Sequence, residues 1–234
     1  MNKFEKAIKE LDYDALKDLT KSDSNWLSWR DKNGRSALHL VADVKVASGS
    51  EEAKNSVRVF QFLLKNGMDL NSIHKVPETG GFFPATPLWH AYTRGRNEKL
   101  YTWLLKNGAM PDHCMFAIAW YDDPKAATLF RKHGAKITDD KGRDNPFLAA
   151  YCWKKFKMAK WFLDNGADVN FADKDGNTAL HFAVKRKFDY NQIEFLLKNK
   201  ANINQQNHAG ISPLRLAEEK RYRKILELLK KYEK

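Results

Sequence analysis

Cysteine is scarce in this sequence, with two residues in a chain of 234. Two cysteines cannot form the dense disulfide framework of a small secreted domain. Neither Cys114 nor Cys152 has a cysteine or histidine at metal-ligand spacing. A reducing compartment is the simplest interpretation, so we expect a cytoplasmic protein.

Long apolar runs are also missing. No stretch approaches the roughly 18 apolar residues that indicate a membrane-spanning helix. Residues 1–7 (Met-Asn-Lys-Phe-Glu-Lys-Ala) lack the apolar segment of a secretory signal peptide. The sequence therefore predicts neither a membrane span nor a signal peptide.

No motif of a familiar catalytic or cofactor site is present. The sequence has no glycine-rich phosphate loop, no nucleophile elbow and no Ser/His/Asp arrangement. Five histidines are scattered, without a partner at the spacing of zinc ligands: His74, His90, His113, His133 and His208. We therefore expect a protein that is not an enzyme and that holds no cofactor and no metal.

Positive charge predominates, because 41 basic residues stand against 29 acidic ones and give a formal net charge of +12. Such an excess favours acidic partners, namely an acidic protein surface, nucleic acid or anionic lipid. The alternative is that lysine-rich outer faces only keep the chain in solution.

The stretch 173–204 contains one complete short structural unit. Residues 173–177 (Asp-Lys-Asp-Gly-Asn) are typical of a turn, and Thr178 is a suitable N-cap for an apolar helix over 178–183. Residues 193–198 carry apolar side chains at helical spacing and predict a second helix. Two helices this short cannot bury their apolar faces alone, so the unit needs a copy of itself on each side.

Copies of this unit recur along the chain. The turn and first-helix motif, or the end of the second helix, returns at 33–39, 62–71, 103–109, 161–170 and 209–215. The steps from Asn145 to Thr178 and from Thr178 to Ser212 are 33 and 34 residues. In this period and in the motif Thr-Ala-Leu-His at 178–181, the chain resembles the ankyrin repeat family.

The resemblance implies an all-α repeat solenoid of helix-turn-helix units joined by β-hairpins or loops, and a scaffold that binds proteins without catalysis. It also implies that His39 and His181 tie neighbouring hairpins together. We expect a monomer with an N-terminal helical cap over 1–30. One continuous domain of about six units, the last a C-terminal cap, should follow at 31–71, 72–110, 111–138, 139–170, 171–204 and 205–231.

Several units depart from the period. Residues 46–54 are inserted before the second helix of the first unit and predict an extended loop or a lengthened helix. Residues 72–85 insert a long finger that carries Phe82 and Phe83. The third unit is short, so we expect it to keep its helices while its hairpin shrinks. Residues 139–144 predict a hairpin in the next unit.

The resemblance also indicates which side chains line the concave face of such a stack: the two positions after the alanines of each first helix, and the hairpin tips. At these positions the sequence has two tryptophans, a tyrosine and several cations, and Trp, Tyr and Arg dominate binding hot spots. We expect the binding surface to comprise Phe82, Phe83, Arg94, Trp120, Tyr121, Trp153, Lys185 and Arg186.

The predicted partner is a protein or peptide whose acidic surface or end matches these cations. One alternative is that Trp120, Tyr121 and Trp153 fill a gap beside the short third unit and belong to the core. A second is electrostatic binding of nucleic acid, with bases stacked on the aromatic rings, or of anionic lipid. A third, by similarity to proteins of intracellular bacteria, is an effector that acts on a host protein inside the host cell.

Overall fold

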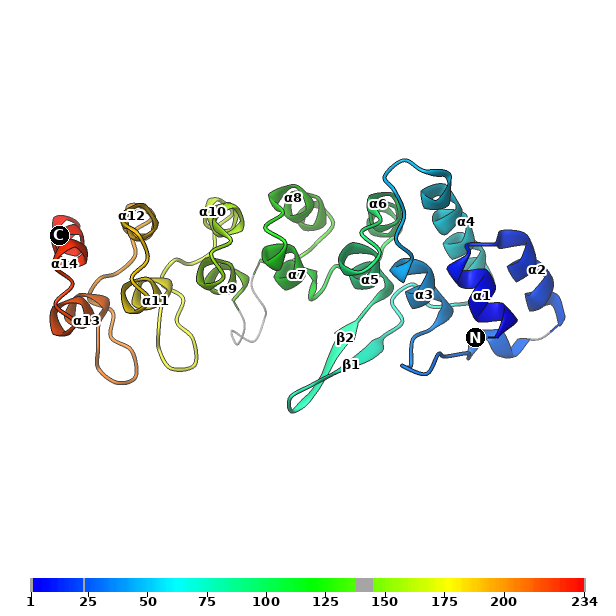
Figure 1. Cartoon of the computed structure of the whole chain (residues 1–234), viewed down its shortest axis with the longest axis horizontal. Coiled ribbons are helices and arrows are strands. Elements are labelled where there is room, and N and C mark those ends of the chain that lie inside the picture. Colours follow the sequence, from blue (N-terminus) through cyan, green and yellow to red (C-terminus); the bar gives the residue numbers. More distant parts are fainter. Residues whose placement is uncertain (1, 23, 138–144, 234) are drawn as a thin grey trace. The chain divides into compact units, whose positions relative to one another are not determined.

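Figure 1 shows the computed structural model of the chain. It describes residues 2–22, 24–137 and 145–233. The chain divides into two compact units, of which the first comprises residues 1–114 and 132–135 and the second comprises residues 115–131 and 136–234. The hairpin predicted over 139–144 lies outside the described residues, and the predicted repeat boundaries stay predictions.

The first unit consists of helix pairs and one β-hairpin. In chain order its elements are α1 (Lys3–Lys9), α2 (Tyr13–Ser22), the 3-10 helix η1 (Ser24–Leu27), α3 (Ala37–Asp43), α4 (Glu51–Lys65), β1 (His74–Glu78), β2 (Gly81–Ala85), α5 (Pro87–Thr93) and α6 (Glu98–Lys106). Helix α3 packs on α5 and α4 packs on α6, so each helix pair covers the apolar face of the next.

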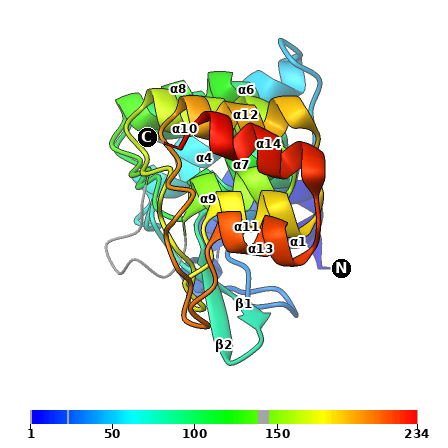
Figure 2. The same cartoon turned by 90° about the vertical axis from the view of Figure 1, so that its left-hand side faces the viewer.

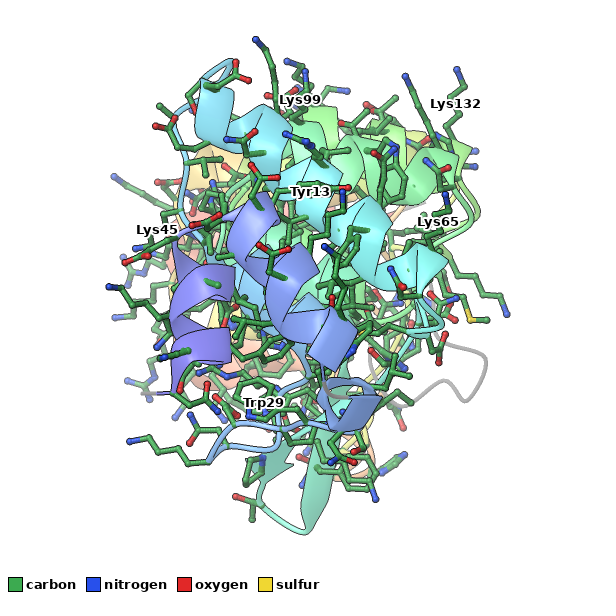
Figure 3. All side chains as sticks on the ribbon, turned by 90° about the vertical axis from the view of Figure 1, so that its right-hand side faces the viewer. Tyr13, Trp29, Lys45, Lys65, Lys99 and Lys132 are labelled. Carbon is green, nitrogen blue, oxygen red and sulfur yellow. The ribbon has the colours of Figure 1, made fainter. Side chains whose placement is uncertain are left out.

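Aromatic contacts join the N-terminal helices to the first repeat. Tyr13 of α2 meets Phe62 of α4 edge to face, with ring centroids 5.4 Å apart, and the Arg58 guanidinium lies 3.8 Å from the Tyr13 ring. Figure 3 shows Tyr13 between these two helices, whereas Lys65 and Lys99 extend outward. Helices α1 and α2 therefore form a packed pair, and the cap predicted over 1–30 stays a prediction.

The insertion at 46–54 forms both a loop and a lengthened helix. Ser50 caps α4 by accepting a hydrogen bond from the Ala53 amide at 3.2 Å, and α4 then runs for 15 residues, compared with nine in α6. The inserted residues therefore lengthen the N-terminal end of α4.

The finger predicted over 72–85 is a β-hairpin that projects from the helices of the first unit (Figure 1). Strands β1 and β2 are antiparallel, with Val76 opposite Phe83 and Pro77 opposite Phe82. Only two residues, Thr79 and Gly80, connect the strands, and Gly80 supplies the positive φ of +84° that the tight turn needs.

The second unit continues with helix pairs joined by loops in its described part. Its elements are α7 (Cys114–Trp120), α8 (Pro124–Lys132), α9 (Pro146–Cys152), α10 (Phe156–Asp164), α11 (Ala179–Lys185), α12 (Tyr190–Lys198), α13 (Pro213–Glu219) and α14 (Arg223–Lys231), the first and last residues of the α7–α8 pair belonging to the other unit. Figure 2 shows α9, α11 and α13 in one layer and α10, α12 and α14 in another. The helices predicted for the short third unit, α7 and α8, are present.

Side-chain caps mark where α9, α11 and α13 begin in the second unit. Asn145, Thr178 and Ser212 each accept a hydrogen bond from the amide three residues later, at 3.1 to 3.5 Å. Pro146 and Pro213 follow two of these caps, where the missing amide proton costs nothing and the fixed φ suits a helix. Because the caps recur with the repeat, the ends of these helices recur with it too.

Candidate functional site

The predicted residues of the second unit lie where the first helix of a pair ends. Trp120 is the last residue of α7 and Tyr121 follows it; Trp153 is the C-cap of α9. Lys185 is the last residue of α11 and Arg186 is its C-cap. We call Trp120, Tyr121, Trp153, Lys185 and Arg186 the helix-end surface. Cations are favoured at such ends because a helix C-terminus carries negative partial charge.

The aromatic side chains of the helix-end surface are exposed. Trp120 is 54% exposed, Tyr121 41% and Trp153 40%. The two indoles touch edge to face, with ring centroids 5.2 Å apart and an interplanar angle of 82°. A side chain that filled a gap in the core would be buried, so these three residues are surface groups.

Cations flank the two indoles. The Lys155 ammonium lies 5.4 Å from the centroid of the Trp120 ring, within cation–π range. Arg186 donates from Nη1 to the Cys152 carbonyl at 3.1 Å, and its guanidinium lies 5.1 Å from the Phe182 ring. The helix-end surface therefore combines exposed apolar area with fixed positive charge.

The other predicted residues, Phe82, Phe83 and Arg94, belong to the first unit. Phe82 is 49% exposed and has the Lys75 ammonium 4.9 Å from its ring. Phe83 is half-buried and packs against Trp89, with centroids 5.2 Å apart. Arg94 is exposed, and its guanidinium lies 5.9 Å from the Trp89 ring.

Trp89 thus joins Phe83 to Arg94, although it is not one of the predicted site residues. The sequence could have indicated Trp89, because it occupies the motif position that holds His39 or His181 in other units. The predicted residues therefore form two groups, one in each compact unit.

The finger is poorly suited to binding an added β-strand. A two-residue connection makes Glu78 and Gly81 a hydrogen-bonded pair, and hydrogen-bonded pairs alternate along an antiparallel ladder. Pro77 and Pro84 then fall at positions whose backbone nitrogens face away from the partner strand. Proline offers no donor there, so both free edges are interrupted, a common protection of edge strands. The finger therefore offers its side chains for contact, and not its backbone edges.

The structure corrects the prediction that the remaining histidines are scattered. His74 and His90 come together with His39 in the first unit: His74 Nδ1 lies 3.1 Å from His90 Nε2, and the His39 ring centroid lies 5.0 Å from that of His90. All three rings are buried. Sixteen residues separate His74 from His90, so no local motif reveals this cluster.

Asp43 is bound into the same cluster instead of projecting freely. His90 Nδ1 lies 2.7 Å from Asp43 Oδ1, and Arg35 bonds the second carboxylate oxygen and also Asp31. Although burial alone would raise the pKa of Asp43, its contacts with His90 and Arg35 hold that pKa below its usual range. The group is a network of satisfied hydrogen bonds inside the repeat core.

The His39 and His181 ties predicted from the resemblance are confirmed. His39 Nε2 lies 3.1 Å from the Ser72 carbonyl and 3.3 Å from that of Ala85, and His181 Nε2 lies 3.0 Å from that of Ile211. Burial lowers the pKa of His39 to about 3, with the nearby His90 and His74 adding to the effect. These imidazoles are neutral structural groups at neutral pH.

Within the described ranges, no three or more His, Cys, Asp or Glu residues are grouped so as to hold a metal ion. Burial raises the pKa of the Cys152 thiol to about 11, and that of Cys114 also rises. Neither thiol is therefore activated as a nucleophile. No helix in the described part of the chain is both long and apolar enough to cross a membrane.

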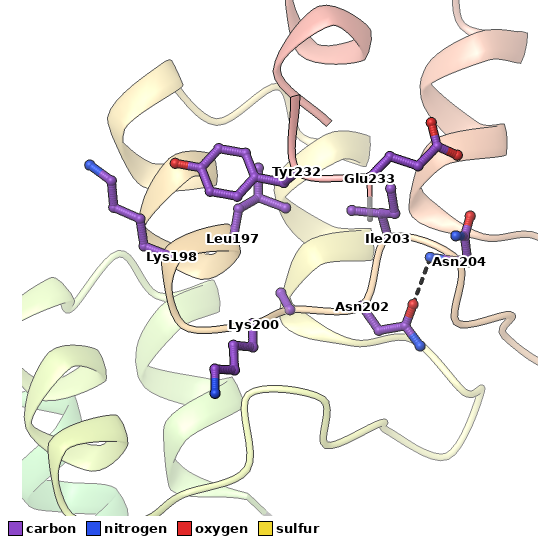
Figure 4. Close-up of a pocket in the computed structure, with 9 residues that line it drawn as sticks. Leu197, Lys198, Lys200, Asn202, Ile203, Asn204, Tyr232 and Glu233 are labelled. Carbon is purple, nitrogen blue, oxygen red and sulfur yellow. Dashed lines mark hydrogen bonds between the residues drawn. The ribbon is translucent and has the colours of Figure 1, made fainter. Parts of the chain in front are cut away.

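A cavity of about 520 Å³ lies between the segment after α12 and the end of α14 (Figure 4). Leu197, Ile203 and the Tyr232 ring form its apolar part, and Lys198 and Lys200 its charged part. The Tyr232 hydroxyl donates to Glu194 at 3.2 Å. None of the predicted site residues lines this cavity, and it contains no catalytic arrangement of side chains.

Comparison with known sequences identifies the family. The pattern "Ankyrin repeats (3 copies)" matches residues 114–207 and 146–234, which together span just over half of the chain. The chain therefore belongs to the ankyrin repeat family, and the predicted fold class is confirmed. Ankyrin repeats serve in general as scaffolds for protein interactions.

The relatives that the chain matches are longer proteins. Chicken (Gallus gallus) inversin is 33% identical over 97 residues, which are 42% of this chain and 9% of inversin. FPV031, named as an ankyrin repeat protein of fowlpox virus (strain NVSL), is 27% identical over 180 residues, which are 75% of this chain and 44% of the viral protein. The chain thus spans less than half of either relative.

Solved structures match along nearly the whole chain. The ankyrin repeat domain of human ASB11 superposes with a TM-score of 0.69 at 21% identity, covering 100% of this chain and 99% of that one. The ankyrin repeat domain of Bcl-3, a member of the IkappaB family, gives 0.73 at 18% identity, with 98% of each chain covered. At such identities the likeness establishes the fold alone.

Proposed function

We propose that this protein is a non-catalytic ankyrin-repeat scaffold that binds a partner protein or peptide through the helix-end surface. Phe82, Phe83 and Arg94 supply a second contact from the first unit. The observation that carries the proposal is the exposure of Trp120 and Trp153, which present a joined apolar surface beside cations. Tryptophan, tyrosine and arginine contribute most to binding hot spots, because they bury large areas with little loss of rotamer freedom.

The charge around this surface favours a partner with acidic groups. Lys155, Lys185 and Arg186 lie in or beside the helix-end surface, and none of them forms an ion pair with a carboxylate of the described residues. Complementary charge mainly improves the rate of encounter and the choice of partner, whereas the desolvated aromatic groups supply most of the affinity.

The absence of catalysis is part of the proposal. Its support is that the cysteine thiols have raised pKa values and that His39, His74, His90 and His181 are buried in structural hydrogen bonds. A general acid, base or nucleophile has to reach a substrate with a suitable pKa. None of these groups satisfies both conditions.

The test is selection from a library of random peptides of about twelve residues displayed on phage, a length that spans several repeats in extended form. Peptides enriched on the wild-type protein are then measured against a Trp120→Ala/Trp153→Ala variant. The matched control is Met110→Ala/Tyr190→Ala, which removes two side chains that are 55% and 51% exposed outside the proposed surface.

We expect the enriched peptides to lose binding to the tryptophan variant and to keep it with the control. The tryptophan variant should retain its free energy of unfolding to within about 2 kcal/mol, since Trp120 and Trp153 are already 54% and 40% exposed to water. Peptides that bind both variants equally, or a tryptophan variant that unfolds, would contradict the proposal.

A further inference from the structure

Cations are concentrated in the turns that follow α9, α11 and α13 in the second unit. Besides Lys185 and Arg186, four exposed cations lie in these turns and two more are the first residues of α14. We call these six the turn cations: Lys154, Lys187, Lys220, Arg221, Arg223 and Lys224. All six are exposed. They begin immediately after Trp153, so the turn cations continue the helix-end surface.

Three turn cations occupy equivalent positions. Lys154, Lys187 and Arg221 follow one another at 33 and 34 residues, the same steps that separate the helix caps. Each has a left-handed backbone, with φ of 60°, 51° and 55°. Glycine or asparagine suits this conformation better than lysine or arginine. Local backbone preference therefore does not account for a positive charge at all three turns.

The three turns lie side by side, because a lysine from each of the first two turns reaches an aromatic ring of the next turn. The Lys154 ammonium lies 5.0 Å from the Phe188 ring, and the Lys187 ammonium lies 4.5 Å from the Tyr222 ring. Helix α11 packs against both α9 and α13, as these contacts require. The turn cations therefore form one strip that runs from Trp153 toward residues 220–224.

The positive charge of this strip is unbalanced. None of the turn cations has a carboxylate oxygen of the described residues within 4.0 Å. The nearest acidic residues in sequence serve other contacts: Asp189 forms the capping box of α12, and Glu219 pairs with Arg215 at 3.0 Å. Glu218 is the exception, an exposed carboxylate at the end of α13.

The turn between α7 and α8 is negatively charged, but its two aspartates are engaged in hydrogen bonds with backbone amides of the protein itself. Asp122 accepts a hydrogen bond from the Met158 amide at 2.8 Å, and Asp123 accepts one from the Ala126 amide at 3.0 Å. The surface thus changes along the second unit from aromatic residues, at Trp120 and Trp153, to cations.

The aromatic rings in and beside the strip are poorly placed to stack nucleic-acid bases. Lys154 lies over Phe188, which is only 5% exposed, and Lys187 lies over Tyr222. Lys155 lies over Trp120, whose ring also meets Trp153 at 82°. Single-stranded nucleic acid is bound on open aromatic faces, and here the protein's own ammonium groups occupy faces of these rings. An anionic ligand without aromatic rings is therefore better suited to the turn cations.

We propose that the turn cations bind an extended acidic segment of the protein partner, rich in aspartate and glutamate. This inference rests on the proposed function, because the same partner places an apolar anchor on Trp120 and Trp153. The bound segment therefore has a fixed direction: its apolar end lies at α7 and α9, and its acidic residues follow over the turns after α11 and α13.

The test uses two synthetic peptides with one anchor, a leucine and a phenylalanine. About six glutamates follow the anchor in the first peptide and the same number of glutamines in the second. Affinities are measured by fluorescence anisotropy at about 150 mM salt, where the Debye length is about 8 Å and only close charges count. The glutamate peptide should bind at least about tenfold more tightly, an average of some 0.2 kcal/mol for each added charge.

The variant Lys220→Glu/Arg223→Glu/Lys224→Glu should abolish the difference between the two peptides. The matched control is Lys174→Glu/Lys200→Glu/Lys230→Glu, which makes the same change in net charge at exposed positions outside the turns. The control should keep most of the difference. Trp120→Ala/Trp153→Ala should weaken both peptides by the same factor.

Equal affinity of the two peptides for the wild-type protein, including no binding of either, would overturn this inference. An equal loss of the difference in the control variant would overturn it too, because only net charge would then matter. Oligothymidylate or phosphatidylserine vesicles that bind more tightly than the glutamate peptide, with the same sensitivity to the turn variant, would replace it by nucleic acid or membrane. If the two peptides differ in affinity but each binds the tryptophan variant as tightly as wild type, the proposed function would be overturned. Binding of an acidic segment by the turn cations would then still be supported.

Discussion

The first and second units use the same histidine motif in different surroundings. In the first unit Ser36 Oγ lies 2.7 Å from His39 Nδ1, and in the second Thr178 Oγ1 lies 2.9 Å from His181 Nδ1. In both, the other ring nitrogen reaches a backbone carbonyl of the following repeat. In both units the same Ser/Thr and His pair thus caps the start of the helix and ties it to the following repeat.

What differs is the environment of the ring. His181 has a single carbonyl partner, at Ile211, whereas His39 lies against His74 and His90 and reaches two carbonyls at the base of the inserted finger. The insertion of 72–85 brings His74 into the core. The regular repeat thus uses one imidazole for its tie, whereas the irregular repeat adds His74 and His90 around His39.

The largest effect is expected at Gly95, which follows α5 and lies against the end of α3 in the first unit. A Cβ on Gly95 would lie 2.1 Å from the Ala42 carbonyl oxygen, so Gly95→Ala forces the two helix ends apart. We expect a loss of about 3 kcal/mol or more in the free energy of unfolding, measured by urea denaturation. Gly81→Ala is the control, since no atom lies within 4 Å of its added Cβ. Similar losses in both variants would contradict a close contact at Gly95.

Acid should destabilise the protein mainly through the first unit. The pKa of His39 is about 3 in the folded chain and about 6.5 in the unfolded chain. Between these two pH values the imidazole is protonated in the unfolded chain and stays neutral in the folded chain. The free energy of unfolding is therefore unaffected by His39 above pH 6.5. Toward pH 3 it falls, by up to about 1.4 kcal/mol per pH unit for this one group.

Urea denaturation at pH 7, 6 and 5 measures this slope. His39→Gln should flatten it, because the variant has no imidazole to protonate in either state. His181→Gln should flatten it less, since burial also lowers the pKa of His181 but without two neighbouring histidines. A steeper effect of the His181 variant would reverse the proposed difference between the units.

A smaller effect is expected at the asparagine ties of the second unit. Asn170 accepts a hydrogen bond from the Asn202 amide at 2.7 Å and donates to the Lys200 carbonyl at 3.3 Å, joining consecutive repeats. Asn204 occupies the same position one repeat later but is exposed. Asn170→Ala should cost about 1 kcal/mol and Asn204→Ala less than about 0.5 kcal/mol. Equal costs in thermal unfolding would show that the tie contributes nothing.

Much of the fold could be predicted because its causes are local. Caps such as Thr178 and Ser212 fix where helices start, and the apolar spacing of 193–198 requires a neighbour to cover it. Asp43 and His90 could not be paired, because they are 47 residues apart and meet only through stacking of α3 on α5.

The candidate site was only partly predictable. The helix-end residues follow from the repeat, but whether Trp120 and Trp153 are exposed depends on packing that the pattern does not contain. The turn cations could have been found, since Lys154, Lys187 and Arg221 keep the repeat period. Their signal is hidden among 41 basic residues, and only the alignment of the turns separates it from ordinary surface charge.

The central claim is that Trp120 and Trp153 anchor a partner. The most direct measurement is the affinity of one library-selected peptide for the wild-type protein and for Trp120→Ala/Trp153→Ala. Hot-spot residues are worth about 2 kcal/mol or more, so we expect binding at least about thirtyfold weaker in a variant that stays folded, with an unfolding free energy within about 2 kcal/mol of wild type. An affinity within about twofold of wild type in a folded variant would contradict the claim.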